Sequence, residues 1–110
     1  MHPRRGEIWW VAFDPSVGGE IQKTRPAIIV SNNGANMALN RVIVVPLTSQ
    51  IAKVYAGQAM VTVNGEPRKA MADQLTTASK GRLRSKFGQV STIDIASVER
   101  AILTHLAIRR

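Results

Sequence analysis

An arginine and a threonine, each at one end of an apolar segment, are the side chains of this chain best suited to chemistry on an anionic group. Arg25 precedes Pro26 and the apolar residues 27–30, and Thr48 directly follows the apolar residues 42–47. A guanidinium carries a permanent charge and a planar fork of donors that matches phosphate, and a hydroxyl can donate to another phosphate oxygen. If the two segments are adjacent antiparallel strands, these side chains meet at one edge of the sheet. There they could stabilise the charge that increases as a phosphodiester is cleaved.

RNA suits this pair as a substrate, because its own 2′-hydroxyl can act as the nucleophile. Cleavage of this kind needs no metal ion and no covalent enzyme intermediate. The chain has no cysteine, no carboxylate cluster and no histidine spacing typical of a metal site, so we expect no cofactor. His2 and His105 would be the usual acid and base, but one belongs to the first residues and the other lies late in a predicted helix. The sequence does not identify the proton acceptor.

Short apolar segments separated by turn residues must position these side chains. Residues 27–30 and 42–47 are apolar on both faces, which indicates buried strands, and Pro46 implies a missing ladder bond near the end of the second. Other strands are predicted at residues 7–13, 58–63, 68–72, 75–77 and 87–90, with one helical turn at 35–39. After the possible cap Ser91, helical spacing predicts a C-terminal amphipathic helix through Ile95, Val98, Ile102 and Leu106.

These elements predict a mainly β (α+β) fold: a small, strongly bent barrel of about six or seven short strands, with the helix packed on it. At 110 residues the chain is long enough for a single domain, which we place at residues 1–110. The apolar run at residues 8–13 is shorter than a signal-peptide core, and no segment has the length of a transmembrane helix. We therefore expect a soluble cytoplasmic protein that does not enter a membrane.

The charge of the chain favours a polyanionic partner. Lys and Arg number 15 against 7 Asp and Glu, a net charge of +8, and the isoelectric point is about 11.2. Nucleic acid is the simplest partner for such a field, although an acidic protein or an anionic membrane surface would be attracted as well. Between residues 80 and 86, basic side chains recur at every second position, which fits either a solvated face or a contact with RNA or an acidic protein.

Four segments in a fixed order carry a resemblance to a known family. They are RRGEIW at 4–9, KTRPAIIVSN at 23–32, VVPLTS at 44–49 and ADQ at 72–74, and they are followed by GQV at 88–90 and the predicted helix. In this combination the chain resembles the MazF/PemK family of toxin endoribonucleases over nearly its whole length. The resemblance implies a homodimeric toxin with an SH3-like barrel. It also implies metal-independent cleavage of single-stranded, mRNA-type RNA at short sequences, leaving 2′,3′-cyclic phosphate and 5′-hydroxyl ends.

The resemblance further implies a partner and a catalytic pair. Members of the family are held inactive by a cognate antitoxin whose acidic tail lies across the RNA-binding groove. Arg25 and Thr48 match the catalytic arginine and threonine of the family by position. Some relatives use an arginine two residues before the Asp-Gln pair together with that aspartate in proton transfer, but here the position is Met71. The Arg/Asp version of the mechanism is therefore in doubt for this chain.

RNA contacts are expected from the loops around residues 18–23 and 51–58 and from the polar residues that follow the apolar segments. The candidates are Gly19, Lys23, Asn32, Ser49, Gln50, Lys53, Asp73 and Gln74. For Asp73 the sequence leaves two roles open, since it could contact the substrate or hold a loop through backbone donors.

Two other functions remain alternatives. A non-enzymatic barrel could hold single-stranded nucleic acid, but such modules stack bases on aromatic side chains, and aromatic residues make up only 5% of this chain. A toxin of the same fold could instead act on DNA gyrase, and it would not need the pair Arg25 and Thr48. Fold alone does not decide between these activities.

Overall fold

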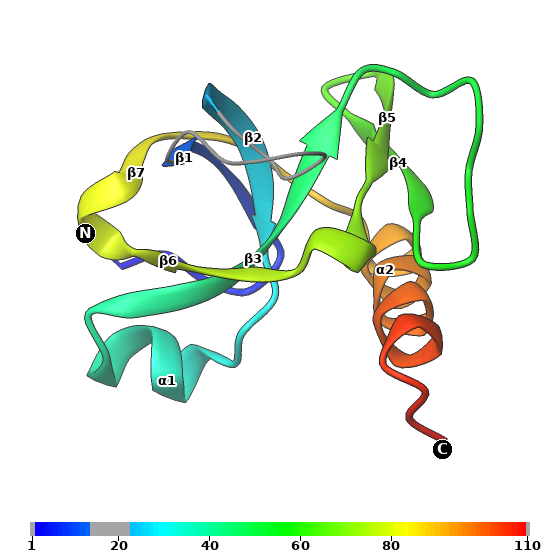
Figure 1. The fold of residues 1–110 in the computed structure, drawn as a ribbon. Helices are drawn as coiled ribbons and strands as arrows, with labels where there is room; N and C mark the ends of the chain where they lie inside the picture. Colours follow the sequence, from blue (N-terminus) through cyan, green and yellow to red (C-terminus); the bar gives the residue numbers. More distant parts are fainter. Residues whose placement is uncertain (1, 14–22, 110) are drawn as a thin grey trace.

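Seven strands form one strongly curled sheet in the computed structural model, which describes residues 2–13 and 23–109 (Figure 1). In chain order the strands are β1 (Glu7–Phe13), β2 (Lys23–Ile29), β3 (Arg41–Thr48), β4 (Ala59–Val63), β5 (Glu66–Ala70), β6 (Thr76–Ser79) and β7 (Leu83–Gln89). Their order in the sheet is β4-β5-β3-β2-β1-β7, with β6 paired to β3. The predicted mainly β architecture with a bent, barrel-like sheet is confirmed.

Strand β3 lies at the centre of the sheet, with β2 on one edge and β6 and β5 on the other. On one edge it pairs with β2, from Val44 opposite Ile29 to Pro46 opposite Ala27. On the other edge its first residues pair with β6, and its last two pair with β5, which places Lys69 opposite Thr48. Val44, Val45 and Leu47 of β3 are completely buried, as expected for a strand that is covered on both faces. The prediction of two doubly apolar, buried strands is therefore confirmed for β2 and β3.

The two faces of the curled sheet carry separate apolar clusters. On one face, Ile8, Ile28, Val45 and Leu47 pack beneath helix α2 (Thr92–His105) together with Val98 of the helix. On the opposite face, the curl of the sheet encloses a second cluster formed by Val11, Ala27, Ile29, Val42, Val44, Ala78 and Leu83. Alternation along each strand sends neighbouring residues to different clusters. The sheet thus has one face covered by a helix and one face closed by its own curvature.

Helix α2 begins at a capping serine and packs its apolar face against the sheet. The side chain of Ser91 accepts a hydrogen bond from the N–H of Asp94 at 3.0 Å, which satisfies a free donor of the first turn. Val98 is fully buried, and Ile95 and Ile102 pack against the core. Leu106 differs from the prediction: it is 50% exposed, because the helix ends at His105 and the chain leaves the sheet there.

The basic segment of residues 80–86 also differs from its predicted form. A short 3-10 helix, η2 (Lys80–Arg82), interrupts it, and β7 begins at Leu83 rather than at residue 87. The alternating basic residues therefore do not form one continuous strand face. The predicted helical turn is confirmed as α1 (Asn33–Ala38), and η1 (Ala72–Gln74) is a second 3-10 helix. In the described part of the chain, no helix has the length and apolar character to span a membrane.

Candidate active site

Arg25 and Thr48 lie on one face of the sheet, at the point where β2 and β3 separate. The paired residues of these strands end at Ala27 and Pro46. Arg25 and Thr48 each lie two residues beyond that pair, so their side chains share its face. Both residues are half-buried, and past the last pair the two strands diverge (Figure 1). As predicted, β2 and β3 are adjacent antiparallel strands, and their pairing brings both residues to the same end of the sheet.

Lys69 joins this end of the sheet, although the sequence did not identify it. It lies directly opposite Thr48 on β5, and its Nζ donates to the carbonyl oxygen of Lys53 at 3.0 Å. Thr48 Oγ1 accepts a hydrogen bond from the N–H of Gln50 at 3.2 Å, which leaves the hydroxyl proton of Thr48 available to donate to a ligand. No sequence signal marks Lys69, because its position depends on the pairing of β3 with β5.

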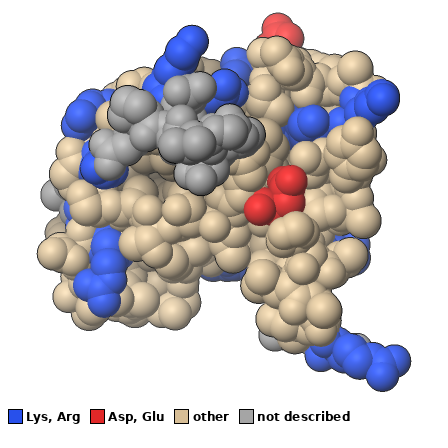
Figure 2. Space-filling view, in the orientation of Figure 1, with Lys and Arg blue, Asp and Glu red and all other residues tan. Residues whose placement is uncertain are grey.

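Positive charge gathers around this end of the molecule. Figure 2 shows Lys and Arg side chains along the upper edge of the molecule, over the start of β2 and over β4 and β5, with an acidic side chain among them; further basic side chains lie at the left edge and near the C-terminus. Lys23 and Lys53 are exposed, as are Ser49 and Gln50. Cations and hydrogen-bonding groups in this arrangement suit the backbone of a nucleic acid.

Residues 72–74 place Asp73 and Gln74 in η1, next to the chain that returns from β5. The N–H of Met71 donates to the carbonyl oxygen of Pro46 at 2.9 Å, which fixes η1 beside β3. Met71 itself is 7% exposed, so the position at which some relatives carry arginine is filled here by a buried thioether. Asp73 contacts the loop before β4, through its N–H to the carbonyl oxygen of Gly57 at 2.8 Å. This backbone hydrogen bond ties η1 to the loop before β4.

Other predicted site residues lie apart or have local roles. Asn32 is at the far end of β2, where its Oδ1 accepts from the N–H of Ala35 at 2.8 Å and caps α1. Lys23 begins β2 with a positive φ of 70°, a conformation that is uncommon for residues other than glycine. Gly19 lies outside the residues that the structure describes.

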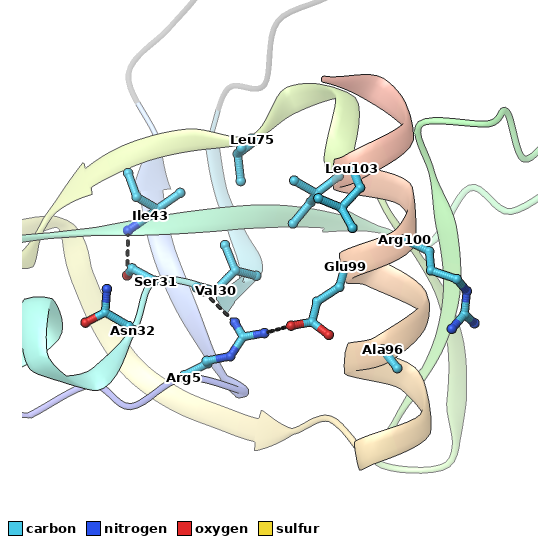
Figure 3. Close-up of a pocket in the computed structure, with 11 residues that line it drawn as sticks. Arg5, Val30, Ser31, Asn32, Ile43, Leu75, Ala96, Glu99, Arg100 and Leu103 are labelled. Atoms are coloured by element: carbon cyan, nitrogen blue, oxygen red, sulfur yellow. Dashed lines mark hydrogen bonds and ion pairs between the residues drawn. The ribbon is translucent and has the colours of Figure 1, made fainter. Parts of the chain in front are cut away.

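An open groove of about 770 Å³ lies at the opposite end of β2 and β3, against α2 (Figure 3). Its walls include Ile43, Leu75 and Leu103. At its base the Arg5 guanidinium donates to the carbonyl oxygen of Val30 at 2.6 Å and forms an ion pair with Glu99. Asn32 is the one predicted site residue among its lining residues. No sequence pattern predicts this groove, because it is assembled from segments far apart along the chain.

Glu7 lies at the same end of the sheet as the groove, which we call the groove end, and its carboxylate accepts hydrogen bonds and pairs with a lysine. Burial raises the pKa of Glu7, but hydrogen bonds from the N–H of Arg4 and the indole of Trp9, together with the nearby Lys86, outweigh this and leave the pKa below its ordinary value of 4.5. Lys86 Nζ lies 3.2 Å from Glu7 Oε2. In the described part of the chain, no group of three His, Cys, Asp or Glu side chains is placed to share a metal ion.

The two tryptophans point to opposite faces of β1, as the alternation of a strand predicts. Trp9 packs against the cluster inside the curl. Trp10 packs against Phe87 with ring centroids 5.0 Å apart and ring planes tilted by 45°, and the Arg68 guanidinium lies 5.3 Å from the centre of the same Phe87 ring. Both tryptophans therefore contribute to packing around the sheet.

Comparisons with known proteins agree with this architecture. Residues 4–106 match a family described as PemK-like, MazF-like toxin of type II toxin-antitoxin system. The endoribonuclease MazF9 of Mycobacterium tuberculosis is 39% identical over 94% of this chain and 95% of its own. The endoribonuclease toxin MazF of Escherichia coli K12 is 30% identical over 91% of this chain and 90% of its own.

Solved structures show the same fold. MazF from Deinococcus radiodurans aligns with a TM-score of 0.85 over 97% of this chain and 98% of that one, at 23% identity. An endoribonuclease from a mycobacterial species, solved in complex with its cognate antitoxin, aligns with a TM-score of 0.80 over 98% of both chains, at 24% identity. Family match, relatives and fold agree with the order of the sequence motifs, and the chain belongs to the PemK/MazF family of type II toxin-antitoxin toxins.

Proposed function

We propose that residues 1–110 act as one toxin domain, an endoribonuclease that cleaves single-stranded RNA at specific short sequences within a toxin-antitoxin pair. The observation that carries this proposal is the position of Arg25 and Thr48 on one face, each two residues beyond the last β2–β3 pair. Relatives named endoribonucleases cover nearly the whole chain. The basic surface around these residues supports a polyanionic substrate.

The proposed reaction uses the nucleophile of the substrate. The 2′-oxygen forms a bond to phosphorus and gives its proton to a base, the bond from phosphorus to the 5′-oxygen breaks, and the 5′-oxygen takes up a proton. The products are a 2′,3′-cyclic phosphate and a 5′-hydroxyl. Arg25 would stabilise the charge that builds on the non-bridging oxygens, and Thr48 would donate its hydroxyl proton to one of them. Because the nucleophile belongs to the RNA and these donors meet the charge, the proposed reaction is metal-independent.

Contacts to the RNA would come from the polar residues around this pair. Lys23, Ser49, Gln50 and Lys53 are exposed near the same end of the sheet, and Gly19, Asp73 and Gln74 complete the proposed set. Asn32 is not part of it, because its side chain caps α1 at the far end of β2. Phosphate contacts would position the strand, and loop shape would select the bases. We assign no residue as the proton acceptor.

We further propose an acidic cognate antitoxin and a homodimeric state, in the cytoplasm. MazE–MazF complexes have been solved for Deinococcus radiodurans. A second copy of the chain would cover the groove of Figure 3, because much of its lining is apolar and, of its two arginines, Arg5 is paired with Glu99. Two chains that each carry a net charge of +8 repel each other, so association favours a face where charges are already paired.

Cleavage of a mixed-sequence RNA by the purified, antitoxin-free protein in chelator tests the proposal. Primer extension would map the cut sites, and phosphatase and kinase treatment of the fragments would identify the ends. We expect cuts at a short common sequence, with cyclic phosphate and 5′-hydroxyl ends. Intact RNA would overturn the proposal. If the protein inhibited DNA supercoiling by gyrase in a parallel assay, gyrase would be the target instead.

A further inference from the structure

The loop at residues 49–58 connects β3 to β4 and begins directly after Thr48. It carries Ser49, Gln50 and Lys53, and its residues 49–56 are all exposed. An exposed loop with this position could sample many conformations unless other elements hold it. Its contacts with the rest of the chain therefore decide how its side chains lie relative to Thr48.

Asp73 holds the far end of this loop with both its backbone and its side chain. Its N–H donates to the carbonyl oxygen of Gly57 at 2.8 Å. Gln58 Nε2 lies 3.5 Å from each carboxylate oxygen of Asp73, and Gln58 Oε1 accepts from the N–H of Tyr55 at 3.0 Å. Asp73 thereby fixes Gly57 directly and orients residues 55–58 through Gln58.

His105 closes the same contact from the end of α2. A methyl group at Gly57 would lie 2.9 Å from His105 Nδ1 and 3.2 Å from Asp73 Cβ. The first separation is shorter than side-chain carbon atoms normally allow, so an alanine at residue 57 would require the imidazole of His105 or the loop to move. Gly57 is buried between η1 and the last residue of α2.

A second contact holds the middle of the loop. Lys69 Nζ donates to the carbonyl oxygen of Lys53 at 3.0 Å, and Lys69 lies opposite Thr48 on the adjoining strand. The loop is therefore fixed once beside Thr48 and once against η1 and α2. A shift at Gly57 would be transmitted to the residues between these two points.

We propose that Gly57, Asp73 and His105 form a latch that positions residues 49–56 and thereby sets which RNA sequences are cut. This inference rests on the proposed endoribonuclease function and assigns Asp73 and His105 as positioning residues rather than catalytic ones. Small displacements of substrate-binding groups strongly affect reactions that depend on alignment. The latch would therefore act on sequence selection and cleavage efficiency without contacting the reacting atoms.

Gly57→Ala and its relief by His105→Ala test the latch. The variants to compare are the wild type, Gly57→Ala, His105→Ala and the double variant, with Gly81→Ala as the matched control. A methyl group at Gly81 meets its nearest atom, Ser79 Oγ, at an ordinary 3.7 Å. The measurements are the distribution of cut sites in a randomised RNA pool, kcat/KM on the preferred sequence, and deuterium uptake of residues 49–58.

We expect Gly57→Ala to lower kcat/KM about tenfold and to reorder the preferred sequences. Adding His105→Ala removes the imidazole Nδ1 that would lie 2.9 Å from the new methyl group. The double variant should therefore have a kcat/KM within about twofold of His105→Ala alone and the same order of preferred sequences. An unchanged order of cut sequences in Gly57→Ala, or no relief in the double variant, would overturn the latch. If Gly57→Ala does not fold, Asp73→Asn keeps the backbone contact, and it should still change the order of preferred sequences.

Deuterium uptake separates this inference from the proposed function. If the wild type leaves RNA intact, the endoribonuclease proposal fails. Faster exchange of residues 49–58 in Gly57→Ala, slowed again in the double variant, would nevertheless support the latch. Equal exchange in all variants would count against it whatever the RNA result.

Discussion

The two ends of the β2–β3 pair differ in charge and in packing. At the groove end, cations meet carboxylates: Arg5 pairs with Glu99, and Lys86 pairs with Glu7. At the other end, Lys69 donates to a neutral backbone carbonyl, and the Thr48 hydroxyl accepts from a backbone N–H. The same two strands therefore present a largely apolar groove with an Arg5–Glu99 ion pair at one end and a basic, polar surface at the other.

This difference shows that the groove and the proposed catalytic pair lie at different ends of the sheet. A groove with apolar walls is the default candidate for a binding site, yet the groove of Figure 3 contains neither Arg25 nor Thr48 among its lining residues. The basic end offers donors for an anionic transition state. The proposed function places catalysis at the basic end and self-association at the groove, and the following variants can separate the two ends.

Arg25→Ala should have the largest effect on RNA cleavage. We expect kcat to fall about 10³-fold or more, because an arginine that stabilises phosphoryl charge contributes on that scale. Arg25→Lys keeps the charge but loses the planar fork, so it should recover only part of the rate. Single-turnover cleavage of a mapped substrate is the measurement, with circular dichroism to verify the fold.

Arg41→Ala is the matched control, since Arg41 is exposed and begins β3 at the opposite end from Thr48. It removes the same charge from the same sheet and should leave the rate within about twofold of the wild type. Equal losses in Arg25→Ala and Arg41→Ala would mean that net charge alone matters. The distinction between the two ends would then be lost.

Thr48→Val should lower kcat by about 100-fold, because it removes one donor to the transition state while keeping the shape of the side chain. Thr48→Ser retains the hydroxyl and should stay within about fivefold of the wild type. A Thr48→Ser variant as slow as Thr48→Val would indicate that the methyl group matters and the hydroxyl does not. Steady-state kinetics on the same substrate would show whether the change lies in kcat or in KM.

The strands that carry this pair were predictable because burial on both faces leaves a sequence signature. The apolar residues 27–30 predict a central strand, and Ala27, Ile28 and Ile29 are completely buried between β1 and β3. The basic residues around Leu83 hide the start of β7, because exposed alternation there resembles a solvated loop. The sequence therefore located the strands of the site better than it located the edge of the sheet.

Contacts between distant segments could not be predicted in the same way. Lys69 reaches Thr48 only through the pairing of β5 with β3, and His105 meets Gly57 from the end of α2. The groove combines Arg5, Ile43 and Leu75 with α2. Each of these residues is ordinary in its own segment, and its role arises only when the fold brings the segments together.

Leu103→Glu should disrupt self-association through the groove. The substitution replaces an apolar lining residue by a carboxylate that a partner chain would have to desolvate, so we expect at least about a tenfold weaker dimer. Ile93→Glu is the control on the same helix, because Ile93 is 77% exposed and is not a lining residue of the groove. Light scattering coupled to size exclusion should report a monomer for Leu103→Glu and a dimer for the control. A wild type that is monomeric at all concentrations would refute the assignment of the groove.

Glu7→Gln should have the smallest effect, confined to stability at the groove end. The folded pKa of Glu7 lies below 4.5, so its ionised form stabilises the fold above that pH, and this contribution disappears as the pH falls through the folded pKa. The free energy of unfolding should therefore differ between wild type and Glu7→Gln by at most about 1 kcal/mol at neutral pH and converge in acid. Urea unfolding across pH 3 to 7, roughly the range over which a carboxylate titrates, measures this difference. A gap that persisted at the lowest pH would show that Glu7 acts through packing and not through its charge, while RNA cleavage at neutral pH should be unchanged because the basic end does not depend on this pair.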